Sequence, residues 1–242
     1  MGKEESLVSV DFWNTLVKAE TGGKKRREVR YEALCKVADS YIDRLPKQEV
    51  EEASRLASEK FNNVWFEEQR TPTTEELISD ILNTLGIPAT QQELDFLEEQ
   101  FQQSLLEGPP EIAEGVREVL PELREKYSLA LISDTMYSPG KVIRSYLETE
   151  NLIDYFSSFV FSDEEGYSKP NPKAYHKVLE ETNSRADRSY HVGDLLVTDI
   201  RGAKNVGMKA ILFTGISGDK SNDEIEPDHR CASWEEIREL LI

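Results

Sequence analysis

The sequence predicts an α/β fold: a three-layer core built on a doubly wound parallel sheet, with a helical domain inserted near the N-terminus. Two observations lead to this prediction. From about residue 110 to the C-terminus, short β-rich runs alternate with helical segments, an order that produces a parallel sheet. Between the first β-rich run and that region, residues 26–107 show only helical periodicity.

The first predicted strand is SLVSV at residues 6–10, and Asp11 follows it directly. A buried parallel strand that delivers a functional residue has this short, β-rich pattern. The helical stretch closes at Gly108-Pro109-Pro110, where the alternating order begins. We therefore expect an α/β core over residues 1–17 and 110–242, and a helical cap over residues 18–109.

The predicted cap should contain about four helices. Proline or glycine interrupts its helical pattern at three places, and a threonine stands where two of the later helices would begin. The breaks are at Pro46, Thr71-Pro72 and Gly86-Ile87-Pro88, and the N-cap candidates are Thr73 or Thr74 and Thr90.

Four more strands are expected in the core, at residues 128–133, 158–162, 189–193 and 209–213. Each is brief, apolar and β-rich, and short crossover helices should connect them. Ligands of such sheets bind at the carboxyl ends of the strands, so the polar residues at those ends are the candidate functional residues. Residues 217–228 are interpreted as a polar surface loop.

The composition excludes several classes of function. The chain has 242 residues and a net charge of −18, so its surface should repel nucleic acid and anionic lipid. None of its apolar runs approaches the length of roughly 20 residues that a membrane span needs, and its N-terminal apolar run is too short for a signal peptide. We expect a cytoplasmic monomer or homodimer. Cys35 and Cys231 lack the spacing of a zinc site or a disulfide framework.

Carboxylates at two strand ends suggest a nucleophile and a metal site. Asp11 follows the first strand, and Asp194 follows the strand at 189–193. A carboxylate attacks phosphorus when a cation and hydrogen-bond donors neutralise the incoming anion. A second carboxylate at an adjacent strand end lets Mg²⁺ bind, with water and substrate oxygens completing its shell. The sequence thus predicts Asp11 as the nucleophile and Asp194 as a magnesium ligand.

Three further strand-end residues offer donors for a phosphoryl group. Lys169 would hold the nucleophile and the phosphoryl oxygens, and the hydroxyls of Ser133 and Thr15 would donate to the same oxygens. In so acidic a chain, a phosphate site must create its own local positive charge. The expected substrate is a small phosphorylated molecule.

Four segments, in order and each after a predicted strand, resemble the motifs of the haloacid dehalogenase-like hydrolase superfamily, subfamily I with a helical C1-type cap. They are SVDFWNTL, LALISDT, KPNPKAY and HVGDLLVTDIRGAKNVGM, with a cap-sized insert between the first two. The resemblance implies that Asp11 becomes phosphorylated. It also implies that Mg²⁺ binds Asp11, the backbone carbonyl of Trp13 and Asp194, and that Asp199 supports the metal through water.

Trp13 departs from the phosphatases of this superfamily, which carry an acid/base Asp at that position. An indole does not transfer protons at neutral pH, so catalysis would lose the roughly 10²- to 10⁴-fold of a general acid or base. Aryl or acyl phosphates, whose leaving groups depart as stable anions, should then be better substrates than alkyl phosphates. Asp134 or Glu164 could replace the acid, although neighbouring residues at a strand end usually point away from each other.

Two other functions stay open. Dehalogenases of the superfamily carry an aromatic Tyr at the position of Trp13. This raises the alternative that the protein is a metal-independent 2-haloacid dehalogenase. Those enzymes resemble SSNxxxD at the fourth motif, whereas this chain has Gly193-Asp194, and this favours magnesium and phosphate. The third possibility is a weakened or regulatory protein that kept the fold after losing its acid.

Structural interpretations compete with the functional one. Asp11 and Asp194 could simply cap helices. Asp199 could lie in the first turn of a helix, where the helix dipole favours an acidic residue. Only the combination of residues at several strand ends favours a site. Asn14, Asp134 and Arg70 are expected to bind substrate.

The basic run at residues 24–27, with Arg30 nearby, is either a solvated linker or a group that attracts an anionic substrate near the hinge of the cap. We interpret His191 as a partly buried strand residue.

Overall fold

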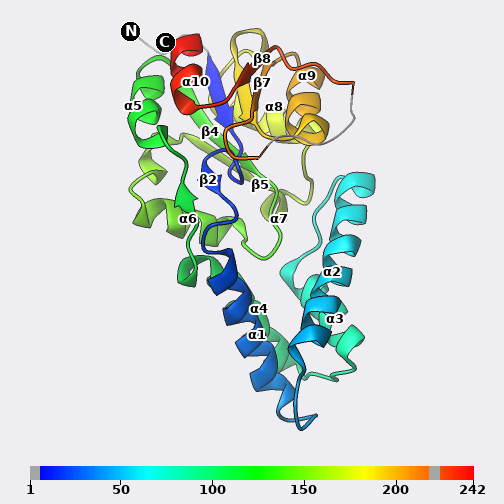
Figure 1. Cartoon of the computed structure of the whole chain (residues 1–242). Helices are drawn as coiled ribbons and strands as arrows, with labels where there is room; N and C mark the ends of the chain where they lie inside the picture. The colour runs from blue at the N-terminus through cyan, green and yellow to red at the C-terminus, as the bar shows by residue number, and fades with distance from the viewer. Residues whose placement is uncertain (1–5, 218–223) are drawn as a thin grey trace.

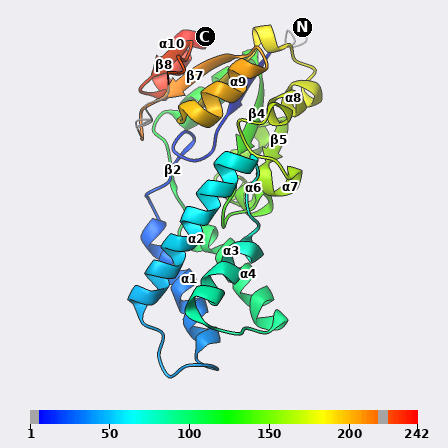
Figure 2. The same cartoon turned by 90° about the vertical axis from the view of Figure 1, so that its right-hand side faces the viewer.

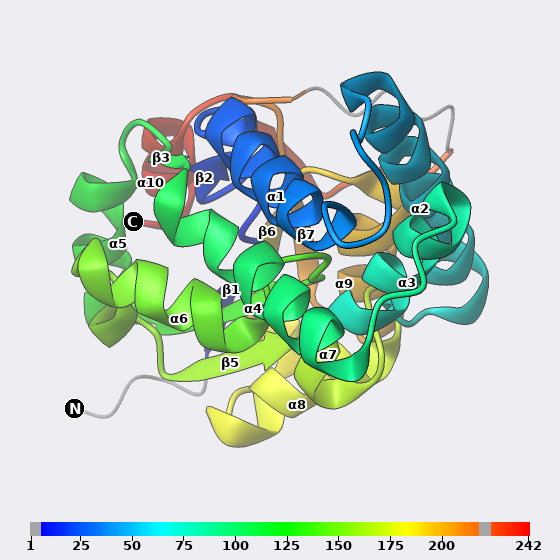
Figure 3. The ribbon, with the colours of Figure 1, turned by 90° about the horizontal axis from the view of Figure 1, so that it is seen from below.

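The computed structural model describes residues 6–217 and 224–242 and has two lobes (Figure 1). One lobe contains a six-stranded sheet with helices on both sides. The other contains helices α1–α4 alone and is called the helical lobe below. Figure 3, seen from below, shows these four helices in front of the sheet lobe.

The sheet is parallel throughout, with strand order β5-β4-β1-β6-β7-β8. β1 lies centrally, with Val10 beside Leu131 of β4 and Val192 of β6. The residues that follow β1, β4 and β6 therefore meet at one edge of the sheet. The strands are β1 (Leu7–Val10), β4 (Ser128–Ser133), β5 (Ser158–Phe161), β6 (Tyr190–Gly193), β7 (Lys209–Phe213) and β8 (His229–Cys231).

Each face of the sheet packs against its own helices, which makes three layers. Along β4, Leu129 and Leu131 belong to one core cluster and Ala130 and Ile132 to the other, as expected from the two-residue period of a strand. The first cluster joins α5 (Val116–Lys126), α6 (Gly140–Thr149) and α10 (Trp234–Leu241). The second joins α8 (Pro172–Glu181) and α9 (Arg201–Asn205), while the short α7 (Ser162–Glu165) follows β5 directly. The predicted fold class is confirmed.

The helical lobe contains the four helices that the sequence predicts, packed around their own apolar cluster (Figure 2). Thr73 and Thr90 start two of them with full capping boxes, each paired with a Glu three residues later. The helices are α1 (Gly23–Ala38), α2 (Lys47–Glu68), α3 (Thr74–Leu85) and α4 (Gln91–Glu107). Across the two described ranges, no helix meets the length and hydropathy needed to cross a bilayer.

Two small features were not predicted. β8 is an edge strand of three residues, two of them polar or charged, so no apolar run marks it. β2 (Val17–Lys18) and β3 (Glu111–Ile112) pair antiparallel where the chain leaves and re-enters the sheet lobe. Of the predicted loop at 217–228, residues 218–223 lie outside the described residues.

The two crossing segments are held together by Arg26. Its buried guanidinium donates to the carbonyls of Ala19 (2.5 Å), Thr21 (3.0 Å) and Gly108 (2.7 Å), which belong to both segments. Gly22, at φ +69°, lies so close to the second segment that a Cβ there would be 2.3 Å from the Gly108 carbonyl oxygen. The close approach of these segments therefore needs glycine.

Candidate active site

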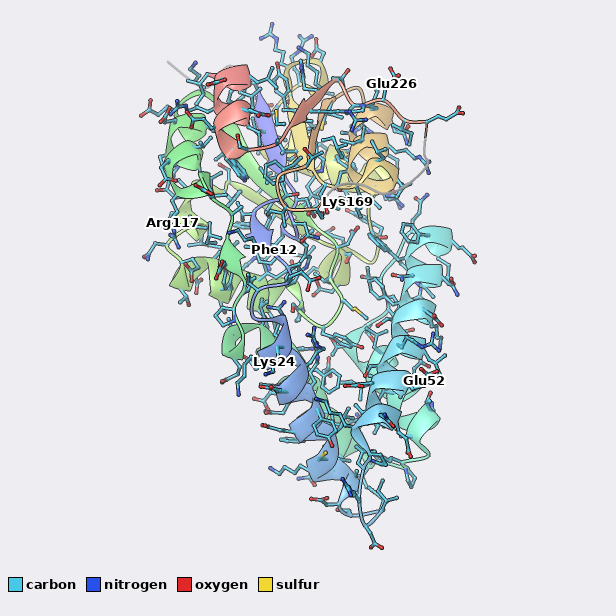
Figure 4. The ribbon with its side chains drawn as sticks, in the orientation of Figure 1. Phe12, Lys24, Glu52, Arg117, Lys169 and Glu226 are labelled. Carbon is cyan, nitrogen blue, oxygen red and sulfur yellow. The ribbon has the colours of Figure 1, made fainter. Side chains whose placement is uncertain are left out.

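Lys169 links two carboxylates at the sheet edge. Its Nζ lies 2.5 Å from Asp11 Oδ1 and 2.7 Å from Asp199 Oδ1, and all three side chains are buried. Figure 4 labels Lys169 at the end of the strands that faces the helical lobe. The Asp11 amide donates to the Val192 carbonyl at 2.9 Å, which fixes the backbone of Asp11 to the end of β6.

The pKa values in this group follow from burial and mutual charge. Burial raises the pKa of Asp11 well above its usual range, although Lys169 acts against that shift. For Asp199, burial acts upward, but the Lys169 ammonium and the His191 ring prevail and lower the pKa. Burial would lower the pKa of Lys169, yet Asp11 and Asp199 raise it well above its usual value. Lys169 therefore stays charged at neutral pH.

His191 holds Asp199 from the sheet side. Its Nε2 lies 3.1 Å from Asp199 Oδ1 and its Nδ1 lies 2.8 Å from Ser9 Oγ. Burial lowers the pKa of His191, so the neutral ring donates from Nε2 and accepts at Nδ1. The interpretation of His191 as partly buried was wrong, since its exposed fraction is 0%. Tyr175 packs edge-on against this ring and donates to the Thr198 carbonyl at 3.0 Å.

The backbone around Asp199 is unusual. Residues Leu196–Ile200 form one turn of π-helix, a feature frequent at functional sites. Asp199 Oδ2 accepts from the Leu195 amide at 3.1 Å and from Thr198 Oγ1 at 3.3 Å. Gly193 makes room for this carboxylate, because a Cβ there would be 2.3 Å from Asp199 Cγ.

Gly193→Ala should therefore displace Asp199 and loosen Lys169. We expect a loss of about 1–3 kcal/mol in the free energy of unfolding, the usual range for overpacking a buried site, together with reduced turnover. Urea unfolding and steady-state kinetics measure the two effects. Wild-type values for both would show that the Asp199 side chain can move away without consequence.

Asp194 faces the same space from the end of β6. Ser217 Oγ donates to its Oδ2 at 2.8 Å, and the Asn14 side chain also hydrogen-bonds to it. Asn14 adopts φ 54°, a left-handed conformation that Asn tolerates better than most residues. Burial and the charge of Asp199 raise the pKa of Asp194 to about 6.

A pocket of about 450 Å³, called the carboxylate pocket below, joins these groups. Four carboxylates and one ammonium line it, so its residues carry a net charge of 1 − 4 = −3 when ionised. Its lining residues are Asp11, Trp13, Asn14, Trp65, Asp134, Lys169, Asp194, Leu195, Thr198, Asp199 and Ser217. A phosphate dianion would be repelled here unless a cation joined the site.

The donor set suits Mg²⁺ in that role. Asp11 and Asp194 supply hard oxygen atoms, and one or two carboxylates with water and phosphate oxygens are the usual magnesium shell. Within residues 6–217 and 224–242, no group of three or more His, Cys, Asp and Glu side chains has a metal-binding arrangement. Asp11 and Asp194 would supply only part of a magnesium shell, and water and phosphate oxygens would complete it.

Thr15 and Ser133 lie deeper than expected. Neither lines the carboxylate pocket, and both are buried. Among the described residues, Thr15 Oγ1 has no hydrogen-bond partner, and the one contact of Ser133 Oγ is with the Asp134 carbonyl at 3.4 Å. Their role as donors to a phosphoryl group stays a prediction.

Asp134 connects the site to the helical lobe. Its Oδ1 accepts from the Lys169 amide at 3.0 Å, and its Oδ2 accepts from Trp65 Nε1 of α2 at 2.9 Å. Burial raises the pKa of Asp134 to about 6, against the effects of Lys169 and Trp65. The expectation that it points away from the site does not hold: it follows the last residue of β4, where strand alternation has ended.

Two predicted residues lie elsewhere. Arg70 pairs with Glu68 and Glu76 and lines a separate surface pocket, so the structure does not bring it to the carboxylate pocket. Glu164 accepts from both terminal guanidinium nitrogens of Arg144 and does not line the pocket either. Trp13 does line it, with the Arg26 guanidinium 5.6 Å from its ring centroid.

Residues 48–213, more than half of the chain, match the family model described as haloacid dehalogenase-like hydrolase. The chain belongs to this family. The predicted resemblance is confirmed, while Asp11 and Trp13 precede the matched range.

Curated relatives of this haloacid dehalogenase-like chain carry phosphatase names. A glyceraldehyde 3-phosphate phosphatase from Pyrococcus abyssi is 44% identical over 100 residues, 41% of this chain and 41% of its own length. A ribulose-1,5-bisphosphate 5-phosphatase from Halopiger xanaduensis is 30% identical over 132 residues, 52% of this chain and 54% of its own length. The chain thus spans about half or less of the length of these relatives.

Solved structures of the same superfamily share the fold over nearly the whole chain. A 2-haloacid dehalogenase from Pseudomonas syringae superposes with a TM-score of 0.75 at 20% identity, covering 98% of this chain and 97% of the other. YfnB from Bacillus subtilis bound to magnesium superposes with a TM-score of 0.73 at 18% identity, covering 99% of each chain. At these identities the similarity establishes the fold alone.

Proposed function

We propose that this haloacid dehalogenase-like protein is a Mg²⁺-dependent hydrolase of small phosphorylated metabolites. The observation that carries the proposal is the buried contact of Lys169 with Asp11, 2.5 Å long, in a pocket shared with Asp194. The phosphatase names of the curated relatives support it.

In the proposed first step, a carboxylate oxygen of Asp11 attacks the phosphorus atom of the substrate. The bond to the leaving oxygen breaks, its electron pair stays on that oxygen, and the phosphoryl group remains on Asp11. Lys169 fixes Asp11 and offsets charge on the phosphoryl oxygens. In the second step, water attacks the phosphorus, the bond to Asp11 breaks, and phosphate is released.

Asp11, the backbone carbonyl of Trp13 and Asp194 are the proposed magnesium ligands. When bound, Mg²⁺ would neutralise charge on the phosphoryl oxygens and orient them. Asp199 contributes indirectly in this scheme, because Lys169, His191, Leu195 and Thr198 already occupy its oxygens. Its main task is then to hold Lys169.

Asp134 is the proposed replacement for the acid that Trp13 lacks. Among the pocket carboxyl groups that are neither the nucleophile nor a proposed metal ligand, Asp199 is already engaged with Lys169 and His191, which leaves Asp134. Asp134 also contacts Trp65 from the opposite lobe. As the acid it would protonate the leaving oxygen, and as the carboxylate it would accept a proton from the attacking water.

Several finer assignments remain part of the proposal. The division into a core of residues 1–17 and 110–242 and a cap of residues 18–109 fits the two lobes of Figure 1. Substrate contacts of Asn14, and phosphoryl contacts of Thr15 and Ser133, stay predictions, as do a cytoplasmic location and a monomeric or homodimeric state.

A screen of phosphorylated metabolites with Mg²⁺, repeated after removal of the metal with EDTA, tests the function. We expect phosphate release that needs Mg²⁺, since four carboxylates surround one ammonium in the pocket. Adding back Mg²⁺ should restore turnover. Turnover that EDTA leaves unchanged would contradict the role of the metal.

The aromatic Trp13 beside Asp11 keeps the dehalogenase hypothesis as the rival. The same screen therefore includes 2-chloropropionate with EDTA, and chloride release is measured. Chloride release without any phosphatase activity would replace the proposed function by the rival.

A further inference from the structure

A second pocket adjoins the carboxylate pocket on the side of the helical lobe. It has a volume of about 410 Å³ and shares Trp13, Trp65 and Asp134 with the carboxylate pocket. Because both indoles and the proposed proton carrier line both spaces, a substrate whose phosphoryl group lies at Asp11 would extend its other end into this second pocket. We call it the aromatic pocket, since Phe61 and Tyr137 also line it.

Arg30 of α1 lines the aromatic pocket and is half-buried. Its guanidinium carbon lies 4.7 Å from the ring centroid of Tyr137. Burial lowers its pKa to about 10, so the group is charged at neutral pH. The charge of Arg30 therefore belongs to the aromatic pocket, whereas that of Lys169, which pairs with Asp11, belongs to the carboxylate pocket.

In the part of the chain that the structure describes, Arg30 has no ion pair within 4.0 Å and no hydrogen-bond acceptor. Three other arginines of the helical lobe have partners: Arg55 pairs with Glu52, Arg70 with Glu68, and Arg26 donates to three carbonyls. A guanidinium that is partly withdrawn from water and has no carboxylate partner loses some of its hydration without compensation, which is unfavourable for the fold. An anionic ligand would supply the missing partner.

We propose that Arg30 binds a second anionic group of the substrate, at the end remote from the phosphoryl group that Asp11 attacks. This inference rests on the proposed function and names its substrate class: small phosphate esters that carry a further carboxylate or phosphate. The planar guanidinium matches either group with two parallel hydrogen bonds. The aromatic walls would hold the carbon chain between the two anionic ends.

Matched esters test the proposal. 3-Phosphoglycerate carries a carboxylate where glycerol 3-phosphate carries a neutral hydroxymethyl group, and ribulose 1,5-bisphosphate adds a phosphate to ribulose 5-phosphate. In the wild-type protein, kcat/KM should be about 10- to 100-fold higher for the member with two anionic groups in at least one pair. A charge-assisted hydrogen bond to Arg30 would produce a difference of this size. In Arg30→Gln that ratio should fall to about 1, and Arg30→Lys, which keeps the charge but loses the planar fork, should restore part of it. The pair affected shows which anion is bound.

Arg27→Gln is the control, because Arg27 is an exposed cation on the same helix and does not line the aromatic pocket. It should keep the wild-type ratio. An unchanged ratio in Arg30→Gln, or the same loss in Arg27→Gln, would overturn the proposal and leave general attraction by the basic run as the cause.

A binding measurement separates this inference from the proposed function. Calorimetry uses Asp11→Asn, which should not turn over. It should give a tighter Kd for 3-phosphoglycerate or ribulose 1,5-bisphosphate than for the matched ester with one anionic group, and adding Arg30→Gln to this variant should remove the difference. Equal Kd values within both pairs would refute the role of Arg30. Absence of Asp11-dependent turnover on any ester would refute the proposed function instead.

Discussion

Asp11→Asn should lower kcat on any phosphate ester by at least about 10⁴-fold, the scale seen when an enzyme loses its nucleophile. The amide occupies nearly the same volume but is a poor nucleophile toward phosphorus. Lys169 keeps its 2.7 Å contact with Asp199, so the ammonium does not lose all partners. Phosphate release measured with Mg²⁺ on an aryl phosphate gives the clearest reading, because an aryl leaving group needs least help from an acid.

Asp154→Asn is the matched control, since Asp154 is an exposed acid of the same lobe. It should behave as the wild type. Circular dichroism and the thermal midpoint of Asp11→Asn should show a folded protein. If the folded variant retained more than about a hundredth of wild-type turnover, another group would have to be the nucleophile.

Asp134→Asn should lower kcat/KM on alkyl phosphates by about 10²- to 10⁴-fold, the range for loss of a general acid. Aryl phosphates should be affected far less, because their leaving groups depart as stable anions. The ratio of aryl to alkyl kcat/KM should therefore rise in the variant. Glu164→Gln is the control, because Glu164 pairs with Arg144 outside the carboxylate pocket.

The pH profile distinguishes proton transfer from a positioning role. Burial raises the pKa of Asp134 to about 6, so its acid form is present below that pH and is lost above it. For alkyl phosphates, wild-type kcat/KM should therefore fall as pH rises through about 6, and Asp134→Asn should lack that limb. A limb retained in the variant would assign it to the substrate, and Asp134 would then only position Lys169.

The main strands and the four helices of the helical lobe were predictable because each has a local signal. Buried parallel strands are apolar throughout, and the capping boxes at Thr73 and Thr90 mark helix starts. β8 and the β2–β3 pair have no such signal. β8 includes His229 and Arg230, and β2 and β3 consist of two residues each from segments about 90 positions apart.

The candidate site was predictable where a residue follows its strand directly, as Asp11 follows β1 and Asp194 follows β6, because parallel strands end at one edge. Lys169 comes after the short α7 that follows β5, and its segment was recognised by its resemblance to a motif. His191 gave no such signal, since its contact with Asp199 depends on a π-turn that brings the carboxylate back over β6. The contact of Trp65 with Asp134 had no sequence signal either, because the sequence does not show which face of a helix in one lobe contacts the other lobe.

Trp65 belongs to the wall that would select the substrate and also donates to the proposed proton carrier Asp134. Selectivity and acid–base chemistry thus share one indole. A substitution at this position that widens the substrate range would also change the proton affinity of Asp134, so laboratory evolution toward bulkier esters should need compensating changes near β4. The sheet lobe produced without α1–α4 would lack that donor.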